Sequence, residues 1–407
     1  MLPRVKINFL NGQLGTVGES ADGLMAIVCG GTQTTADLPH GLRPFVLNTV
    51  YEFTSADDLN AFNLGYSTNI GVRMAVSAFY QQAGNGARLI LYPVTESRTM
   101  SFICDIAHKD PGTLYDLIMK TNGRLRGIGI CNVNSGNTEM EDGMLKDVYD
   151  ALPKAQAAAE FATDELYGPL FVALEGEGFT TDPEEDDVRD LTTENYNRVA
   201  VTLGRRPDSG PGETAVARLL GRVASIPVQR NIGRVKDGPL VVSSTLYLGR
   251  DLVEENTSLV AQLNDKGYIV PRKHVGRTGY FFADDPLACV KTDDYASLAN
   301  RRVIDKAYRI AYDTMLEELL DELELNEDGT LQYGVVKGWQ QMLENAINRQ
   351  MTALGELSAT DGEGCKCFID ASQNVVATSR IELTLKVRPY GYARFIDVNL
   401  GFQVTTA

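Results

Sequence analysis

The chain is poor in the residues that most enzymes use for catalysis and metal binding. It has only three histidines, His40, His108 and His274, which lie in unrelated polar contexts. A catalytic triad or a histidine metal site would need partners that these contexts do not supply. No phosphate-binding loop, nucleophile elbow or H-E-x-x-H pattern occurs, and two G-x-G pairs lack the third glycine of a dinucleotide fingerprint. We therefore predict no catalytic residue, no cofactor-binding residue and no metal site.

Long apolar runs and an excess of positive charge are also missing. No stretch approaches the ~20 consecutive apolar residues of a membrane span, and the N-terminus has no apolar core typical of an export signal. The net charge is −16, and such a surface repels the phosphate backbone of nucleic acids. We expect neither a membrane nor a nucleic acid as a partner. Most of the six cysteines lie in or beside apolar runs, which favours buried free thiols in a reducing compartment.

Two acidic segments could be mistaken for metal sites. The run Glu324–Gly329 imitates the start of an EF-hand loop, but it begins with Glu, and Val335 occupies the twelfth position, where a bidentate Glu belongs. We interpret it as a helix end followed by a turn. The run Asp182–Asp187 could gather a hard cation, but a dense charge run is more typical of a solvated loop.

The first two thirds of the chain alternate short apolar runs with helical patterns, which predicts an α/β fold. Strands are expected at Leu24–Cys29, Ala87–Tyr92, Leu125–Val133, Leu170–Leu174, Val199–Leu203 and Tyr268–Val270. Helices are expected at Ala56–Leu64, Val72–Gln82, Leu114–Thr121, Met144–Phe161, Glu213–Val223 and Ser258–Lys266. Continuously apolar strands indicate a sheet that helices cover on both faces. Ser55 and Asp58 have the spacing of a capping box.

The last third predicts an α+β domain. A long helix is expected at Leu298–Glu322, with Ile304, Ala307, Tyr308, Ala311, Met315 and Leu319 on its buried side. A second helix is expected at Val335–Leu354, with an apolar stripe of Val335, Trp339, Met342, Leu343, Ala346, Ile347, Met351 and Leu354. Alternating apolar residues then predict strands at 381–387 and 396–404, separated by a turn at Pro389–Gly391.

Both ends of the chain have the alternation of amphipathic strands. The apolar positions are Val5, Ile7 and Phe9 at one end, and Ile396, Val398, Leu400, Phe402 and Val404 at the other. A glycine-rich segment follows the first strand, as in a flexible arm. Strands of this kind can pair within their own subunit or extend the sheet of another chain. The pattern alone fits both alternatives.

Charge is segregated along the chain. Residues 310–336 contain eight carboxylates and no Lys or Arg, and residues 217–235 contain four arginines and no carboxylate. Complementary patches of this kind can set the register between subunits, although pairing within one subunit is equally compatible with the sequence. The candidate contact residues are Arg218, Arg222, Arg230, Arg234, Glu317, Glu318 and Asp321.

Several motifs resemble the contractile tail sheath proteins of phages and phage-like injection systems. The run Gly276–Phe282 and the arginine-rich helix Asn300–Lys306 are similar to the sheath pattern, and so are the helix around Trp339 and the segment Val387–Ile396. The N-terminal region resembles the family more loosely. Tyr280-Phe281-Phe282 departs from the commonest pattern, which leaves the subfamily open. Sheaths of Mu-like phages or gut-bacterial prophages are the most similar.

The resemblance implies a structural subunit that is not an enzyme. Such subunits stack as hexameric rings around an inner tube, exchange terminal strands with their neighbours, and contract to drive the tube through a cell envelope. The implied division is an N-terminal arm (1–22), an outer α/β domain (23–272), an inner domain facing the tube (273–390) and a C-terminal arm (391–407). The expected tube contacts on the second helix are Lys337, Gln341, Glu344 and Asn348.

The resemblance also implies partners and a location. The partners are further copies of the chain, the tube protein, and baseplate and tail terminator proteins. The location is a virion tail or phage-like particle assembled in the bacterial cytoplasm. Two alternatives remain at this point: a metal-dependent α/β hydrolase built around Asp182–Asp187, or another tail component such as a baseplate or capping protein.

Overall fold

The computed structural model describes residues 21–35, 41–64, 68–134, 136–180, 188–204, 214–359 and 362–398. The chain divides into two compact units, Met1–Tyr312 and Asp313–Ala407. The predicted arm residues Val5, Ile7, Phe9, Leu400, Phe402 and Val404, and the acidic run Asp182–Asp187, lie outside the described residues.

The first unit is built on a six-stranded sheet in the order β2-β3-β1-β4-β7-β9. Its strands are β1 (Met25–Gly31), β2 (Tyr51–Phe53), β3 (Leu89–Thr95), β4 (Gly127–Cys131), β7 (Phe171–Glu175) and β9 (Val199–Thr202). Only β2, at one edge, runs antiparallel to its neighbour. Every residue of β1, β4, β7 and β9 is buried, as expected for a parallel sheet that helices cover on both faces.

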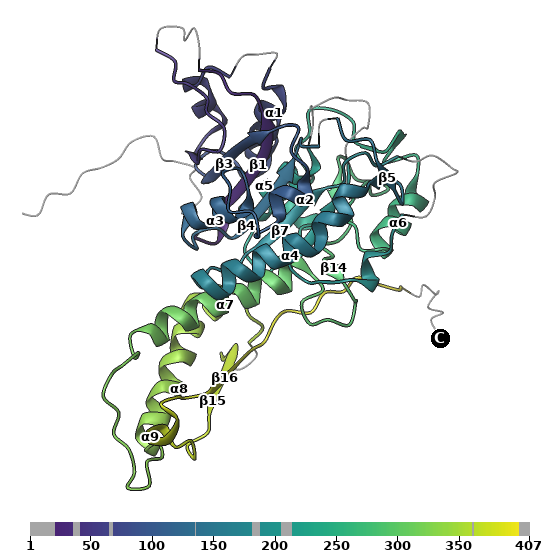
Figure 1. Ribbon diagram of the computed structural model, residues 1–407. Helices are drawn as coiled ribbons and strands as arrows, with labels where there is room; N and C mark the ends of the chain where they lie inside the picture. The colour runs from purple at the N-terminus through teal and green to yellow at the C-terminus, as the bar shows by residue number, and fades with distance from the viewer. Residues whose placement is uncertain are drawn as a thin grey trace, which may run out of the picture. The chain divides into compact units, whose positions relative to one another are not determined.

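Two groups of helices cover this sheet, as Figure 1 shows. Helices α1 (Ile70–Ala83) and α5 (Ala215–Ser225) pack against each other and against one face. Helices α2 (Met100–Cys104), α3 (Leu114–Thr121) and α4 (Lys146–Leu166) lie on the other face. Threonine side chains accept hydrogen bonds from the first turns of α2, α3 and α5, which satisfies backbone donors that a helix start leaves free.

Shorter elements surround the sheet of the first unit. They are η1 (Ala21–Gly23), η2 (Ala56–Ala61), β5 (Met140–Glu141), β6 (Met144–Leu145), η3 (Leu191–Thr193), β8 (Asn195–Tyr196), η4 (Val235–Asp237), β10 (Tyr247–Leu248), β11 (Asp251–Leu252), α6 (Thr257–Asp265), β12 (Pro271–Arg272), β13 (Phe281–Phe282) and β14 (Ala288–Cys289). The pairs β5–β6, β8–β14, β10–β11 and β12–β13 are antiparallel. The domain boundary expected after residue 272 therefore falls inside the β12–β13 pair, and the two units divide later, after Tyr312.

Most of the elements predicted for the first unit are confirmed. Five of the six predicted strands form the main sheet, and the capping box of Ser55 and Asp58 is present. The helix that this box begins is a 3-10 helix. The sixth predicted strand, around Ile269, forms only an isolated bridge with Thr202. All six cysteines are free and buried, as expected.

Helix α7 (Leu298–Leu316) begins at the predicted residue but ends before the predicted Glu322, and of its predicted buried side only Ala307 is fully buried. Its buried residues include Arg301, Arg302, Asp305 and Lys306, whereas Tyr308 is 37% exposed and Leu319 lies beyond the helix and is 66% exposed. The charged side chains can be buried because they pair with charges elsewhere in the first unit. Asp305 binds Arg198 and Arg301, and Asp22 binds Lys306 and Arg309.

The second unit contains helix α8 (Tyr333–Ile347), the π-helical turn η5 (Asn348–Thr352), strand β15 (Cys365–Ile369), helix α9 (Val375–Thr378) and strand β16 (Leu383–Val387). The strand predicted near 381–387 is confirmed as β16, but it pairs antiparallel with β15, from Cys365 opposite Val387 to Ile369 opposite Leu383. Residues 388–398 form no regular element. The turn predicted within Glu324–Gly329 is present, with Gly329 at a φ of 80°, but the preceding helix α7 already ends at Leu316, so the run is not a helix end.

The buried face of α8 differs in part from the predicted stripe. Leu343, Ile347 and Met351 are buried as predicted, but Val336 and Gln340 complete that face. Trp339 is only half-buried, and Leu354 is exposed. Strand β15 packs against α8, and the backbone N–H of Cys367 in that strand donates a hydrogen bond to the carboxylate of Glu344 in the helix.

Candidate assembly surfaces

The described residues at the edge of the sheet where α/β enzymes usually bind ligands contact one another closely. The strand order reverses between β1 and β4, and ligands of open α/β sheets bind outside the carboxyl ends of strands at such a point. Here a Cβ atom on Gly30 would lie 1.9 Å from the carbonyl oxygen of Asn132, so the two strand ends are in direct contact. Asn69, 1% exposed, spans the entrance with hydrogen bonds to Thr32 and Leu64.

Two buried carboxylates at the same edge are used as structural acceptors. Glu175, at the end of β7, accepts hydrogen bonds from the backbone N–H groups of Ala215 and Val216 at 2.9 and 3.0 Å. It therefore neutralises the positive end of helix α5. Glu177 accepts from the backbone N–H of Val133 and from the side-chain amide of Asn134, both at 3.1 Å. Neither carboxylate points to a substrate.

Three of the cysteines are poor nucleophiles in this fold. Burial raises the pKa of Cys365 and of Cys367 to about 11 and that of Cys289 to about 12. The thiolate, not the thiol, attacks and binds metals. Among the described residues, no group of three or more His, Cys, Asp or Glu side chains could hold a metal ion. Within that same part of the chain, no helix is long and apolar enough to cross a bilayer.

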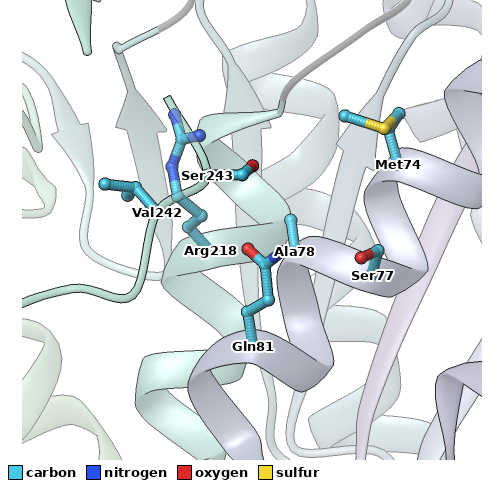
Figure 2. Close-up of a pocket in the computed structure, with 7 residues that line it drawn as sticks. All are labelled: Met74, Ser77, Ala78, Gln81, Arg218, Val242 and Ser243. Carbon is cyan, nitrogen blue, oxygen red and sulfur yellow. The ribbon is translucent and has the colours of Figure 1, made fainter. Parts of the chain in front are cut away.

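A small cavity lies between α1, α5 and the segment that follows η4. Figure 2 shows its lining residues, which are Met74, Ser77, Ala78, Gln81, Arg218, Val242 and Ser243. Its free volume is about 10 Å³, roughly what one water molecule needs. Arg218 donates a hydrogen bond to the carbonyl oxygen of Gly204 at 2.7 Å. The cavity is too small for a substrate or a cofactor.

The four arginines of the predicted basic patch have different environments. Arg218 and Arg222 are 4% and 8% exposed. The guanidinium group of Arg222 donates to the carbonyl oxygens of Ile232, Asp237 and Gly238. Arg230 and Arg234 keep side chains that are 39% and 41% exposed, and both bind Asp237. Because Arg218 and Arg222 are buried, only Arg230 and Arg234 of the four predicted residues can belong to an exposed basic surface.

The predicted tube-contacting residues of α8 also separate into two groups. Lys337 and Gln341 are exposed. Glu344 is partly buried, and its carboxylate accepts the backbone N–H of Cys367 at 2.8 Å. Asn348 likewise accepts the backbone N–H of Gly364 at 3.1 Å. Glu344 in α8 and Asn348 at the start of η5 therefore bind the backbone at and just before β15, whereas Lys337 and Gln341 are exposed.

The β15–β16 hairpin and the segment after it leave backbone and apolar groups unpaired. In the described residues each of these strands pairs only with the other, but Glu344 binds the outward backbone N–H of Cys367 on β15, so the open edge is that of β16. The following segment is held at Arg388, whose backbone bonds Gly364 and Ser358. Beyond it, Phe395, Ile396 and Val398 are 88%, 76% and 71% exposed. Burying such side chains would contribute roughly 1.5–3 kcal/mol each, which the isolated subunit does not obtain.

The sequence matches one protein family along nearly its whole length. Residues 2–286 match the family described as DUF2586, N-terminal domain, and residues 294–407 match DUF2586, C-terminal domain. The chain belongs to the DUF2586 family. No curated protein matches this DUF2586 chain.

Solved structures with the same fold come from contractile injection particles. One neighbour is the helical sheath of the anti-feeding prophage in the contracted state, with 16% identity, a TM-score of 0.63, and coverage of 98% of this chain and 99% of that chain. A chain from the baseplate of the same prophage has 15% identity and a TM-score of 0.62, with 99% of each chain covered. The contracted sheath of an extracellular contractile injection system (PVC) has 14% identity and a TM-score of 0.59, with 99% and 98% covered. The predicted resemblance to contractile sheath proteins is thus confirmed for the fold.

Proposed function

We propose that this DUF2586 chain is a structural subunit of a contractile sheath and has no catalytic role. The observation that carries the proposal is the length of the structural match, since both units are covered almost completely in chains taken from sheath assemblies. The described residues at the switch point of the sheet support it, because Asn69, Glu175 and Glu177 bind other groups of the chain there.

The subunit assembles with further copies through its terminal segments. The exposed Phe395, Ile396 and Val398 can become buried if their segment adds a strand to the open edge of a β15–β16 hairpin in another copy. The N-terminal residues Val5, Ile7 and Phe9 carry the same alternation and take the same role. The polymer consists of stacked six-membered rings around an inner tube, and its contraction moves that tube.

A truncation tests this assignment directly. Removing residues after Tyr392 should leave a folded subunit that no longer polymerises, since residues 393–398 form no regular element. Electron microscopy of the full chain should show rings or tubes, and circular dichroism should give the same folded signal for both proteins. If the truncated protein forms tubes, the C-terminal segment is not needed for assembly. If the full chain stays monomeric, the proposed sheath function is wrong.

The second unit faces the inner tube in this proposal, through Lys337 and Gln341. A polar contact suits the task because it must break when the sheath widens, and a large apolar patch would bind too firmly to release. A cysteine at Gln341 should crosslink to the tube protein in extended particles. A cysteine at Glu344 should not, because that position faces β15, and one at Glu185 should not if the acidic run lies on the outside.

A baseplate or capping component is the second candidate, because one structural neighbour is a chain from a baseplate. Stoichiometry in purified particles separates the two. A sheath subunit should be among the most abundant proteins, and a baseplate subunit should be present in a few copies per particle. The remaining proposed partners are the tube, baseplate and terminator proteins of a virion tail or phage-like particle that assembles in the bacterial cytoplasm.

A further inference from the structure

The turn between β12 and β13 presents a compact cationic surface. Arg272, Lys273 and Arg277 are exposed on it, and no carboxylate occurs from Val270 to Phe282. The turn is closed by Gly276 and Gly279 at φ values of 75° and 88°. We call residues 272–278 the cationic loop.

The cationic loop is only weakly neutralised by its own unit. Lys273 lies 3.5 Å from Glu254, whereas Arg272 and Arg277 form no ion pair within residues 21–35, 41–64, 68–134, 136–180, 188–204 and 214–312. Partial burial, with the charges of Arg272 and Arg277, lowers the pKa of the adjacent His274 below its usual value. The loop is therefore a region of positive potential on a chain whose net charge is −16.

An exposed aliphatic side chain lies at the centre of this loop. Val275 is fully exposed, between Lys273 and Arg277 in sequence. A single exposed aliphatic residue is ordinary on a protein surface. Val275 would be buried in an interface only if a partner surface has an apolar position between carboxylates.

The second unit carries such a surface at residues 313–322, which we call the acidic shoulder. Its carboxylates belong to Asp313, Glu317, Glu318, Asp321 and Glu322. Within residues 313–359 and 362–398 none of these five forms an ion pair, and no Lys or Arg occurs from Ile310 to Val336. Leu316, Leu319 and Leu320 lie among them and are 47%, 66% and 95% exposed.

Leu320 is the clearest sign that the acidic shoulder has a partner. Its φ is 66°, in the left-handed region that a branched side chain rarely adopts. Its side chain is 95% exposed, so packing against the described residues does not hold it in this conformation. Strained backbone conformations of this kind are found at segments that contact ligands or change conformation.

We propose that the cationic loop of one copy docks on the acidic shoulder of a second copy, with Val275 against Leu319 and Leu320. The charges are complementary, and each surface has an aliphatic centre with charged residues around it, which is the usual arrangement of a protein interface. A second copy is the occupant because the chain supplies both halves, and three clustered cations on an acidic protein are too few for nucleic acid. This inference rests on the proposed self-assembly and identifies one of its contacts.

Two charge-reversed proteins test the contact. The loop variant carries Arg272→Glu, Lys273→Glu and Arg277→Glu, and the shoulder variant carries Glu317→Lys, Glu318→Lys and Asp321→Lys. Each alone should need a concentration at least about tenfold higher than the wild type to assemble, because like charges then face each other. An equimolar mixture should assemble near the wild-type concentration, because the loop of each variant then matches the shoulder of the other.

Mixing separates contacts between copies from contacts within one chain. If loop and shoulder paired inside a chain, joining both sets of substitutions in one chain would restore assembly but mixing would not, and that result overturns the proposal. Loop-variant assembly at the wild-type concentration would overturn it as well. A control with Arg88→Glu, Arg124→Glu and Lys146→Glu, which reverses three partly exposed cations of the first unit that pair with Glu52 and Glu139, should assemble normally. If the unmodified chain does not assemble, the proposed function fails rather than this contact.

A neutral substitution gives an independent test of the apolar centre. Leu320→Asn suits a left-handed backbone better than leucine does, so the subunit should unfold at an equal or higher temperature. Assembly of this variant should nevertheless weaken, because Val275 loses its contact. A variant that assembles as well as the wild type would exclude Leu320 from the interface.

Discussion

Replacing Asp305 by Asn should destabilise the first unit more than any exposed charge substitution. The Asp305 carboxylate lies 3.2 Å from Arg198 and 2.7 Å from Arg301. All three residues are less than 10% exposed. The amide keeps the shape of the side chain but leaves two buried guanidinium groups without their counterion. Removing one partner of a buried ion pair costs about 3–5 kcal/mol, and we expect a loss in that range.

A second aspartate provides a matched control. Asp237 also binds two arginines, Arg230 at 3.1 Å and Arg234 at 2.7 Å, but both arginine side chains are about two fifths exposed. Water screens these pairs, and exposed pairs contribute only about 0–1 kcal/mol each. Asp237→Asn should therefore destabilise the unit by about 1 kcal/mol. The contrast between the two aspartates measures the effect of burial at a constant number of partners.

The assay must follow the first unit alone, because two units need not unfold together. Trp339 is the chain's single tryptophan and lies in α8 of the second unit. Its fluorescence should therefore be almost unchanged in both variants. Urea unfolding followed by hydrogen exchange at the amides of β1 and β4 should reveal the loss. Equal losses for Asp305→Asn and Asp237→Asn would refute the reasoning, and so would a loss for Asp305→Asn below about 1 kcal/mol.

Three further predictions follow from close packing and charge. Gly30→Ala should lose at least about 3 kcal/mol or fail to fold, because its Cβ atom would lie 1.9 Å from a backbone oxygen that cannot move away. Gly338→Ala in α8 should gain about 0.5–1 kcal/mol in thermal unfolding, since no atom lies within 4 Å of the added methyl group. Burial alone would raise the pKa of Asp22, but Lys306 and Arg309 outweigh it and lower that pKa. Asp22 should therefore contribute stability above its unfolded pKa of about 3.9 and lose it as pH falls further. Asp22→Asn should flatten the acid limb of a stability–pH curve, and an unchanged limb would contradict this.

The main sheet could be predicted from the sequence because its signals are local. Strands β1, β4, β7 and β9 are buried on both faces, so each is a continuous apolar run in the sequence. Helix α3 has the predicted bounds, since Thr113 caps its start and Asn122 ends it in a left-handed conformation. These residues act on their immediate neighbours, and no distant partner is needed to interpret them.

The candidate surfaces were harder to predict because burial of a polar residue depends on distant partners. Arg218 and Arg222 lie in a segment without carboxylates, which indicates an exposed basic patch, but they bind backbone carbonyl oxygens. Glu344 in α8 and Asn348 at the start of η5 lie on the polar side of the predicted helix, but they bind the backbone N–H groups of Cys367 and Gly364. The spacing of apolar residues shows which side of a helix is buried in a core. It does not show which backbone N–H or carbonyl groups of distant residues will bind the polar side.

The charged face of α7 illustrates the same limit and has a mechanical consequence. Arg301, Asp305 and Arg309 recur every four residues, a spacing that places alternating charges on one side of a helix and is visible in the sequence. Their partners Asp22 and Arg198 are far away along the chain. Apolar side chains would tolerate a small slide of the helix, whereas guanidinium–carboxylate pairs require a fixed geometry.

Helix α7 should therefore be held in one register by these pairs, and an apolar replacement can test it. A variant with Arg198→Met, Arg301→Leu and Asp305→Leu should retain most of the stability, because apolar residues of similar volume often replace a buried ion network without loss. Its α7 amides should nevertheless exchange faster than those of the wild type, since several registers become accessible. Slower or equal exchange would show that shape alone positions the helix, and the charges would then be dispensable for its placement.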